Sequence, residues 1–399
     1  MHKRCLFSFV VFVSALWLPA QVPEAHAGAR ARDLGVPFTG TPGPLNAITD
    51  VPNVEVGNTT LISGAASADS NDKPVRTGVS VVLPRGKGNN DPVYAGWFSE
   101  NGNGEMTGTT WIEESGFLEG PVALTNTHSV GVVRDAIIDW SLKHVDAKHL
   151  WSLPVVAETW DGWLNDINGF HVKPGDLFHA LDTAKSGSVP EGNVGGGTGM
   201  VCYGFKGGIG TASRVLSAGY GGYTVGVLVQ CNCGRRPQLT IAGVPVGQEI
   251  PESVPYAANT PPVPGGEEQG DVGSIIIIVA TNAPLLPHQL KRLARRATLG
   301  LARTGSTSGN GSGDIFLAFS TTNPHADDVP GPNAVFAVSN ERISPIFAAA
   351  VEATEEAIVN AMVGASTMSG IDGHTVIEIP HGRLSEIMRK FNRYQEPYR

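Results

Sequence analysis

One serine of this chain, Ser274, is a candidate nucleophile for a hydrolytic reaction. Ser274 follows Gly265–Gly273, a stretch of glycines and acids with few apolar residues, and precedes the apolar run Ile275–Ala280. If the peptide bond before Ser274 were cut, this residue would carry both a hydroxyl and an α-amine. An α-amine has an ordinary pKa of about 7.7–8.0, so near neutral pH part of it is free base that could activate the hydroxyl. The alternative is a plain linker that enters a strand, and the residue types alone favour that alternative.

Polar side chains at the ends of two expected strands could serve such a nucleophile. Asn232 follows the strand expected over Tyr223–Gln230, and its amide could donate to an oxyanion; a turn-forming asparagine is the alternative. Glu158 ends the strand expected over Leu153–Glu158. Its carboxylate could pair with a substrate ammonium, and the alternative is an exposed acid at a strand end.

A third polar segment, Ser306–Asp314, concentrates hydroxyls before the expected strand Ile315–Phe319. Ser312 and Asp314 could hold and tune a nucleophile through hydrogen bonds. Taken alone, a glycine- and serine-rich loop remains the slightly better interpretation.

Other motifs indicate structure more than chemistry. The run Gly195–Gly199 lacks the Lys-Ser/Thr pair of a phosphate-binding loop, so we interpret it as a close backbone approach inside the fold. His128 lies in Thr-His-Ser, but the chain has no G-x-S-x-G elbow, which favours a core or pocket-lining histidine. The chain also has no H-E-x-x-H, so no zinc-protease motif is present.

The expected elements alternate between strands and helices, which predicts one α/β unit. The apolar run after Ser274 is typical of a strand buried on both faces. We expect further strands at 54–56, 77–83, 109–112, 121–124 and 375–379. We expect helices at 132–144, 287–305, 344–364 (capped by Ser344) and 384–391.

Composition describes a globular protein without affinity for nucleic acid. The 399 residues are 41% hydrophobic and 16% charged, with 50 glycines and 28 prolines that indicate many turns. The net charge is −9, and no Lys/Arg cluster interleaves with aromatic residues, so nucleic acid is not an expected partner. The most basic stretch, Lys291–Arg296, is interpreted as a solvated helix face.

Residues 1–27 have the pattern of a signal peptide. A basic start, an apolar core from Cys5 to Leu18 and the motif Ala25-His26-Ala27 precede Gly28. The apolar core is short for a membrane span. We therefore expect an exported protein without a membrane anchor, placed best in a bacterial periplasm; a retained anchor is the minority alternative.

Three cysteines follow this segment: Cys202, Cys231 and Cys233. A bond between Cys231 and Cys233 is not expected. One disulfide from Cys202 and three buried thiols remain equal alternatives, and without CxxC or histidine pairs the case for zinc is weak.

Several long blocks of the chain, in order, resemble one family, the L-aminopeptidase/D-amino-acid esterase-amidases, and most closely its exported β-peptidyl aminopeptidases. The resemblance runs from about Ile48 to the C-terminal region. Its blocks are NGNGEMTGT from Asn101, ALTNTHSVG from Ala123, VVAETWDGWLNDINGFHV from Val155, EGNVGGGTGM from Glu191, GDVGSIII from Gly270 and STSGNGSGDIFLAFST from Ser306.

This resemblance implies a serine hydrolase of the N-terminal-nucleophile type that cuts itself between Gly273 and Ser274. It implies an α/β fold, an αββα sandwich assembled from a larger chain, residues 28–273, and a smaller chain, residues 274–399. It further implies a homotetramer of cleaved heterodimers and no metal or other cofactor.

By the same resemblance, Ser274 is the nucleophile and its α-amine the general base. Ser312 and Asp314 support it, Asn232 supplies the oxyanion hole, and Glu158 binds the free amine of the substrate. The family often has a tyrosine near Gly169, where this chain has Phe170, which has no hydroxyl to donate.

The function expected from this resemblance is removal of N-terminal β-amino acids from peptides, amides and some esters. Within the class, the alternatives are an L-aminopeptidase/D-amino-acid esterase-amidase for small α-residues and an amide-oligomer hydrolase. From another class, the alternative is an exported binding protein with an uncut chain.

Overall fold

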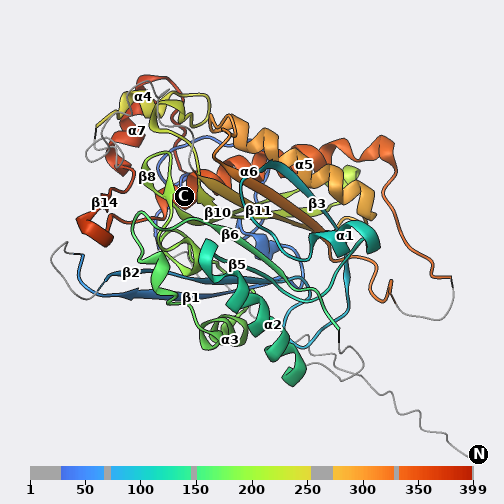
Figure 1. Cartoon of the computed structure of the whole chain (residues 1–399). Coiled ribbons are helices and arrows are strands. Elements are labelled where there is room, and N and C mark those ends of the chain that lie inside the picture. The colour runs from blue at the N-terminus through green and yellow to red at the C-terminus, as the bar shows by residue number, and fades with distance from the viewer. Residues whose placement is uncertain (1–27, 67–72, 145–150, 253–272, 328–331, 398–399) are drawn as a thin grey trace, which may run out of the picture.

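The computed structural model describes residues 28–66, 73–144, 151–252, 273–327 and 332–397. Two β-sheets lie face to face at its centre, with helices on both outer sides, so the expected αββα sandwich is confirmed (Figure 1). Among the described helices, none has the length and apolar character to cross a membrane.

The larger sheet has six strands in the order β4-β3-β12-β11-β10-β9. Its central pair, β11 and β12, is parallel, and the other neighbours are antiparallel. The strands are β3 (Val93–Gly102), β4 (Phe117–Leu118), β9 (Gly208–Val215), β10 (Thr224–Asn232), β11 (Ser274–Thr281) and β12 (Gly313–Ser320).

Strand β11 explains why the apolar run after Ser274 contains no polar residue. Side chains alternate between the two faces of a strand. Ile275, Ile277 and Val279 therefore pack toward the helices, while Ile276 and Ile278 pack toward the second sheet. The prediction of a strand buried on both faces is confirmed.

The smaller sheet has four strands in the order β1-β2-β5-β6. Its strands are β1 (Glu55–Ser63), β2 (Val75–Leu83), β5 (Val122–Asn126) and β6 (Val155–Thr159). Strands β5 and β6 are parallel, so both deliver the residues that follow them to the same edge of this sheet. Glu158 and the segment after Asn126 meet at that edge.

Two pairs of helices close the sandwich. Helices α5 (Pro287–Arg303) and α6 (Ser344–Val363) cover the larger sheet, and α2 (Val130–His144) and α3 (Pro174–Thr183) cover the smaller one. The inward faces expected for α5 and α6 are confirmed, because all the residues predicted to face inward are buried. They are Leu290, Leu293, Ala297 and Leu301 of α5, and Phe347, Val351, Thr354, Ile358 and Met362 of α6. The remaining α-helices and strands of the described residues are α1 (Thr109–Ser115), α4 (Val246–Glu249), α7 (His381–Lys390), β7 (Val201–Cys202), β8 (Phe205–Lys206), β13 (Met368–Ser369) and β14 (Thr375–Val376).

Three local expectations were wrong. The segment 109–112 is helical and not extended: α1 begins after Gly108 in the left-handed region and buries Ile112, so packing overrides the β-branched composition. Ser344 is the first helical residue of α6, and Ile343 stands at the cap. The strand expected at 375–379 is only the two-residue β14.

The glycine run Gly195–Gly199 lies buried against the facing sheets, as interpreted from the sequence. A Cβ atom on Gly197 would lie 2.4 Å from the backbone nitrogen of Ile209, so no larger residue fits there. The run is therefore a close backbone approach inside the fold.

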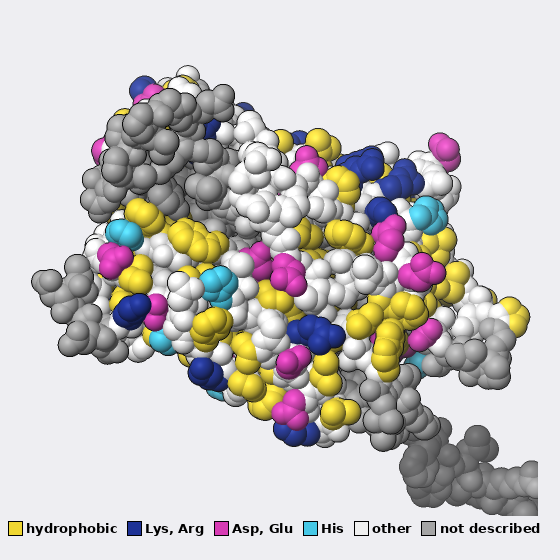
Figure 2. All heavy atoms as spheres, viewed as in Figure 1, with side chains coloured by type: hydrophobic (Ala, Val, Ile, Leu, Met, Phe, Trp, Pro, Cys, Tyr) yellow, Lys and Arg dark blue, Asp and Glu magenta, His cyan; other side chains and the backbone are white. Residues whose placement is uncertain are grey.

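Lys and Arg side chains gather over α5 on the face shown in Figure 2. Lys291 pairs with Glu113 at 2.6 Å, and the guanidinium of Arg296 lies 4.4 Å from the ring centroid of Phe347. The basic stretch is thus the outer face of an amphipathic helix, as expected.

Candidate active site

Ser274 begins a central strand of the larger sheet. As the first residue of β11, it is paired with Asn232 of β10 on one side and with Gly313 of β12 on the other. Residues directly opposite each other in an antiparallel pair project to the same face, so Ser274 and Asn232 share one face of the sheet. Ser274 is 5% exposed, so the sequence-predicted nucleophile lies within the fold.

The peptide bond before Ser274 is fixed by the neighbouring strand. The backbone N–H of Gly313 donates to the carbonyl oxygen of Gly273 at 3.0 Å. A Cβ atom on Gly273 would lie 2.3 Å from the carbonyl oxygen of Asn232, so only glycine fits before the serine. A donor from rigid backbone therefore points at the carbonyl that a cut before Ser274 would have to attack.

Ser312 and Asp314 flank Gly313, the strand partner of Ser274. The Ser312 hydroxyl donates to Oδ1 of Asp314 at 2.6 Å, and both side chains are fully buried. The pairing of β12 with β3 is irregular between Asp314 and Ile315, as in a β-bulge, which breaks the ladder beside this pair. The structure thus brings the hydroxyl–carboxylate pair next to the strand position of Ser274.

The Asn232 side chain is held at both ends. Its Oδ1 accepts a hydrogen bond from the Val201 N–H at 2.7 Å, and its Nδ2 donates to the Trp160 carbonyl at 2.9 Å. Because one partner is a donor and the other an acceptor, the amide cannot flip. An amide nitrogen carries two N–H groups, so a second one remains for an oxyanion beyond the bond to Trp160.

Glu158 is a buried carboxylate at the end of β6, with 3% of its surface exposed. Its Oε2 accepts from the Thr127 hydroxyl at 2.5 Å, and its Oε1 accepts from the Glu105 N–H at 2.9 Å. Burial raises the pKa of Glu158, and these two hydrogen bonds oppose that rise. A desolvated carboxylate of this kind is suited to a cationic partner.

One glycine places this carboxylate close to the strand next to Ser274. A Cβ atom on Gly104 would lie 3.3 Å from Oε1 of Glu158 and 3.1 Å from Cα of Gly313. Glu158 of the smaller sheet and Gly313 of the larger sheet therefore approach the same point. The five polar residues selected from the sequence come from both sheets and gather at one edge of the sandwich: Ser274, Asn232, Ser312, Asp314 and Glu158.

His128 and Phe170 stand at the outer side of Glu158. Their rings stack, with centroids 6.1 Å apart and an interplanar angle of 22°. His128 is exposed, so the expectation of a core histidine is wrong and that of a lining residue is supported, since its ring stacks on Phe170 beside Glu158. Phe170 is 58% exposed and adopts a positive φ of 51°.

The sequence did not reveal the groups that orient these side chains. Two of them are backbone groups, the Val201 N–H and the Trp160 carbonyl, and backbone groups leave no mark in residue types. The Thr127 hydroxyl had a usable signal, because it directly follows the apolar strand β5, which is parallel to the strand of Glu158.

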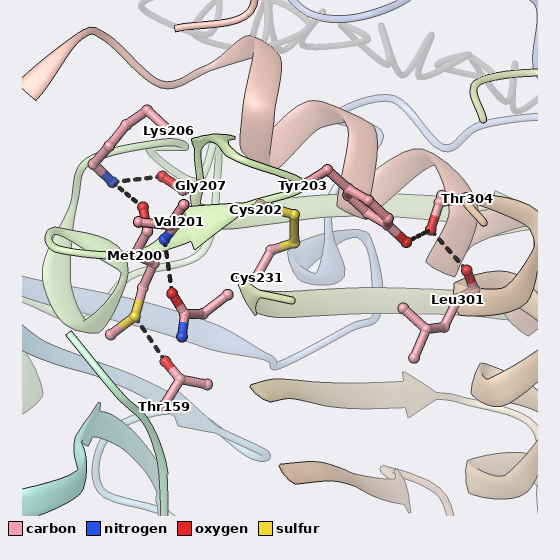
Figure 3. Close-up of a disulfide and its surroundings, with 11 residues drawn as sticks. Thr159, Met200, Val201, Cys202, Tyr203, Lys206, Gly207, Cys231, Leu301 and Thr304 are labelled. Carbon is pink, nitrogen blue, oxygen red and sulfur yellow. Dashed lines mark hydrogen bonds between the residues drawn. A yellow bond between two sulfur atoms is a disulfide. The ribbon is translucent and has the colours of Figure 1, made fainter. Parts of the chain in front are cut away.

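The cysteine alternatives are resolved in favour of one disulfide. Cys202 of β7 is bonded to Cys231 of β10 (Figure 3). The buried Cys233 has its sulfur within 4.8 Å of both. The disulfide lies directly beside the hydrogen bond from Val201 to Asn232, because Val201 precedes Cys202 and Asn232 follows Cys231 in the chain.

Comparisons with known proteins agree with this geometry. The model of Peptidase family S58 matches residues 46–376. The β-peptidyl aminopeptidase BapA of Sphingosinicella microcystinivorans is 56% identical over 371 residues, which cover 92% of this chain and 93% of that protein.

Solved structures show the same fold at high identity. The L-aminopeptidase D-Ala-esterase/amidase of Ochrobactrum anthropi, described as a serine aminopeptidase with a variant of the Ntn hydrolase fold, superposes with a TM-score of 0.83. It is 48% identical, and the match covers 92% of this chain and 99% of that one. A β-aminopeptidase of Burkholderia sp. has a TM-score of 0.80 and 46% identity, with 91% of this chain and 99% of that one covered.

Proposed function

The chain belongs to peptidase family S58, and we propose that it is a self-processing serine aminopeptidase that removes N-terminal β-amino acids from peptides and amides. The acyl group of the substrate is carried on Ser274. The likeness to named β-peptidyl aminopeptidases and β-aminopeptidases supports the enzyme class and the substrate class.

One observation carries the mechanism: the bond before Ser274 lies where a nucleophile and an amide donor meet. Ser274 is the strand partner of Asn232, and the carbonyl oxygen of Gly273 accepts the Gly313 N–H at 3.0 Å. A carbonyl held by a fixed donor is already polarised, which lowers the barrier to attack as charge develops on its oxygen. This geometry supports self-cleavage at the Gly273–Ser274 bond.

Self-cleavage is proposed to proceed through an ester. The Ser274 Oγ attacks the Gly273 carbonyl carbon, the C–N bond breaks, and the nitrogen takes up a proton to become the α-amine of Ser274. Water then attacks the ester carbonyl and releases the Gly273 carboxylate and the Ser274 hydroxyl. The products are the two chains 28–273 and 274–399.

In the mature enzyme the freed α-amine of Ser274 accepts the proton of its own hydroxyl as that hydroxyl attacks the substrate carbonyl. Asn232 and the Gly313 N–H donate to the oxyanion; one such donor is typically worth roughly 2.7–4 kcal/mol. The Ser312–Asp314 pair, with its 2.6 Å hydrogen bond, supports the nucleophile. Water then hydrolyses the acyl-enzyme, so the reaction requires only these groups and water.

Glu158 is proposed to bind the ammonium of the substrate. Its buried carboxylate gains an opposite charge when a free amine enters, which offsets the cost of its desolvation. The anchor is the amine and not a substituent on the α-carbon. An additional methylene between amine and carbonyl, as in β-amino acids, is therefore compatible with the site, and Phe170 with its stacked partner His128 forms one outer wall.

A second candidate is an L-aminopeptidase/D-amino-acid esterase-amidase for small α-residues, which the Ochrobactrum anthropi structure favours at 48% identity. Amide-oligomer hydrolysis is a further variant of the same chemistry. Turnover of a β-homo-amino-acid amide beside the matching α-amino-acid amide decides between them. A higher kcat/KM for the β-substrate supports the proposal, and a higher value for the α-substrate supports the second candidate.

We further propose that the protein is exported to the periplasm, loses residues 1–27 and assembles as a homotetramer of cleaved heterodimers. The packing of the segment just after residue 28 supports a mature start there: Ala31 is fully buried, and Arg30 pairs with Glu191 at 2.8 Å. N-terminal sequencing of the larger chain tests the loss of residues 1–27, light scattering of the purified protein tests the assembly, and cell fractionation tests the export.

A denaturing gel tests the proposal as a whole. Two bands, the smaller beginning Ser-Ile-Ile-Ile-Ile-Val, are expected from active protein. A single band from active protein would overturn the mechanism, and a single band from inactive protein would favour a binding function.

A further inference from the structure

A small buried hairpin lies against the end of β10 on which Asn232 stands. Strands β7 and β8 form it, and its turn uses positive φ angles at Tyr203 and Gly204, as in a type I′ turn. The hairpin touches three consecutive residues of the β10 end. A disulfide joins it to Cys231, the Val201 N–H donates to Asn232, and the Tyr203 N–H donates to the carbonyl of Cys233.

Lys206, the last residue of this hairpin, is fully buried. Its ammonium donates to the carbonyls of Met200 and Gly207 at 2.8 Å each (Figure 3). It also donates to the carbonyl of Gly197 at 3.4 Å. All three N–H groups of the ammonium therefore have acceptors. Burial lowers the pKa of Lys206 to about 7, against the opposing charge of Asp161.

The carbonyl of Met200 and the N–H of Val201 belong to one peptide group. Lys206 thus binds one end of the peptide group whose other end binds the Oδ1 of Asn232. Hydrogen bonds in such a chain polarise one another, and a cation at its head strengthens each donor that follows. The chain ends at the Nδ2 of Asn232, the proposed oxyanion donor.

We propose that Lys206 is a positioning residue that orients and polarises Asn232 through the Met200–Val201 peptide group. The proposal rests on the proposed function, because it deepens the role given there to Asn232. It predicts that the charged form of Lys206, which is present below its pKa of about 7, acts on the transition state, where the oxyanion forms, and not on the binding of the substrate.

The test compares Lys206→Met, which removes charge and donors, with Lys206→Gln, which keeps donors without charge. The matched control is Arg236→Met, because Arg236 donates to the Tyr203 and Gly204 carbonyls at the turn of the same hairpin but not to the peptide group beside Asn232. Cleaved active sites are counted on a denaturing gel. The rate of self-cleavage, kcat, KM and Tm are then measured for each variant.

Lys206→Met is expected to lower kcat per cleaved site, or the self-cleavage rate, by about tenfold or more, with KM within about twofold. The kcat per cleaved site, or the self-cleavage rate, of Lys206→Gln is expected to lie between that of Lys206→Met and that of the wild-type protein. Arg236→Met is expected to lower Tm while kcat stays within about threefold.

Three results overturn the inference: an unchanged kcat in Lys206→Met, an equal loss of kcat in Arg236→Met, or unfolded protein from both Lys206 variants. The last two assign the lysine to stability. The wild-type protein tests the proposed function separately. If it cleaves itself and turns over substrate, the proposed function stands even where the Lys206 variants overturn this inference.

Discussion

The Gly313 N–H donates to the Gly273 carbonyl across 3.0 Å, from a strand that runs parallel to the one that Ser274 begins. In the uncut chain this bond holds the carbonyl that Ser274 attacks in the proposed mechanism. After the proposed cleavage, the Gly313 N–H faces the position that the Gly273 carbonyl has vacated. The precursor and the mature enzyme are thereby proposed to use one oxyanion site twice, first on the chain itself and then on a substrate.

Replacing the nucleophile should stop both reactions. We expect Ser274→Ala to give a single uncleaved chain without peptidase activity, because no hydroxyl remains to form the ester. Ser274→Thr is the matched variant, since it keeps a hydroxyl, and it should retain some cleavage. Gel analysis and N-terminal sequencing give the answer, and normal processing of Ser274→Ala would refute the mechanism.

Neutralising Glu158 should weaken the binding of substrates with a free amine. We expect Glu158→Gln to raise KM by about tenfold or more, since the cation loses its buried partner. Glu105→Gln is the control: it keeps the backbone N–H that donates to Glu158 and removes only an exposed like charge, so KM should stay within about twofold. An unchanged KM in Glu158→Gln would remove this residue from the amine-binding role.

The same carboxylate predicts a pH dependence. Burial raises the pKa of Glu158, so its charged form is present above that raised pKa and is lost as the pH falls through it. The acidic limb of kcat/KM should therefore lie at higher pH than the ordinary glutamate value of about 4.3. A profile of kcat/KM for an amide substrate measures this step, which lies at lower pH than the step that the Ser274 α-amine sets, and Glu158→Gln should abolish only the lower step.

A buried ion network should make stability sensitive to acid. The Glu356 carboxylate binds Arg32 and Arg214 at 2.7 Å and Asn46 at 2.6 Å. Burial alone would raise the pKa of Glu356, but the two arginines and the hydrogen bonds hold it below its ordinary value. Its stabilising contribution is therefore present above the unfolded pKa, about 4.3, and is lost as the pH falls through the lower folded pKa.

Glu356→Gln should accordingly cost about 3–5 kcal/mol of unfolding free energy at neutral pH, because it leaves the buried Arg214 without its 2.7 Å partner. Glu355→Gln is the control on the neighbouring residue, whose partner Arg303 is half-exposed. Thermal unfolding at several pH values measures both. A cost for Glu356→Gln that does not shrink in acid would contradict the assigned role.

The disulfide should contribute to stability and to the geometry of Asn232. Cys202 and Cys231 are 29 residues apart, and closure of such a loop is typically worth about 2–4 kcal/mol. We expect Cys202→Ser to lower Tm and also kcat, because the bond lies beside the contact from Val201 to Asn232. Cys233→Ser leaves the bonded pair intact and should change both less. Equal effects of the two variants would contradict this role.

The residue types by themselves determined the strand after Ser274, the inward faces of α5 and α6, and the polar residues that end the strands. Periodicity carries this information, because a strand buried on two faces admits only apolar side chains, and a helix needs one apolar stripe. The blocks around Asn101, Val155 and Ser306 also indicated the family, and therefore the αββα fold.

Only the tertiary structure decided how those residues meet. The β-branched residues of 109–112 favour a strand, but the segment forms helix α1 because Ile112 packs into the core. The cysteine pairing depends on the hairpin of β7 and β8, which brings Cys202 to Cys231 of β10. The orientation of Asn232 depends on a backbone carbonyl of residue 160 and a backbone N–H of residue 201, both distant from it in the chain. These backbone groups do not depend on the residue type, so the sequence does not reveal them. Such contacts arise from the packing of two sheets, so no local pattern of residues could have predicted them.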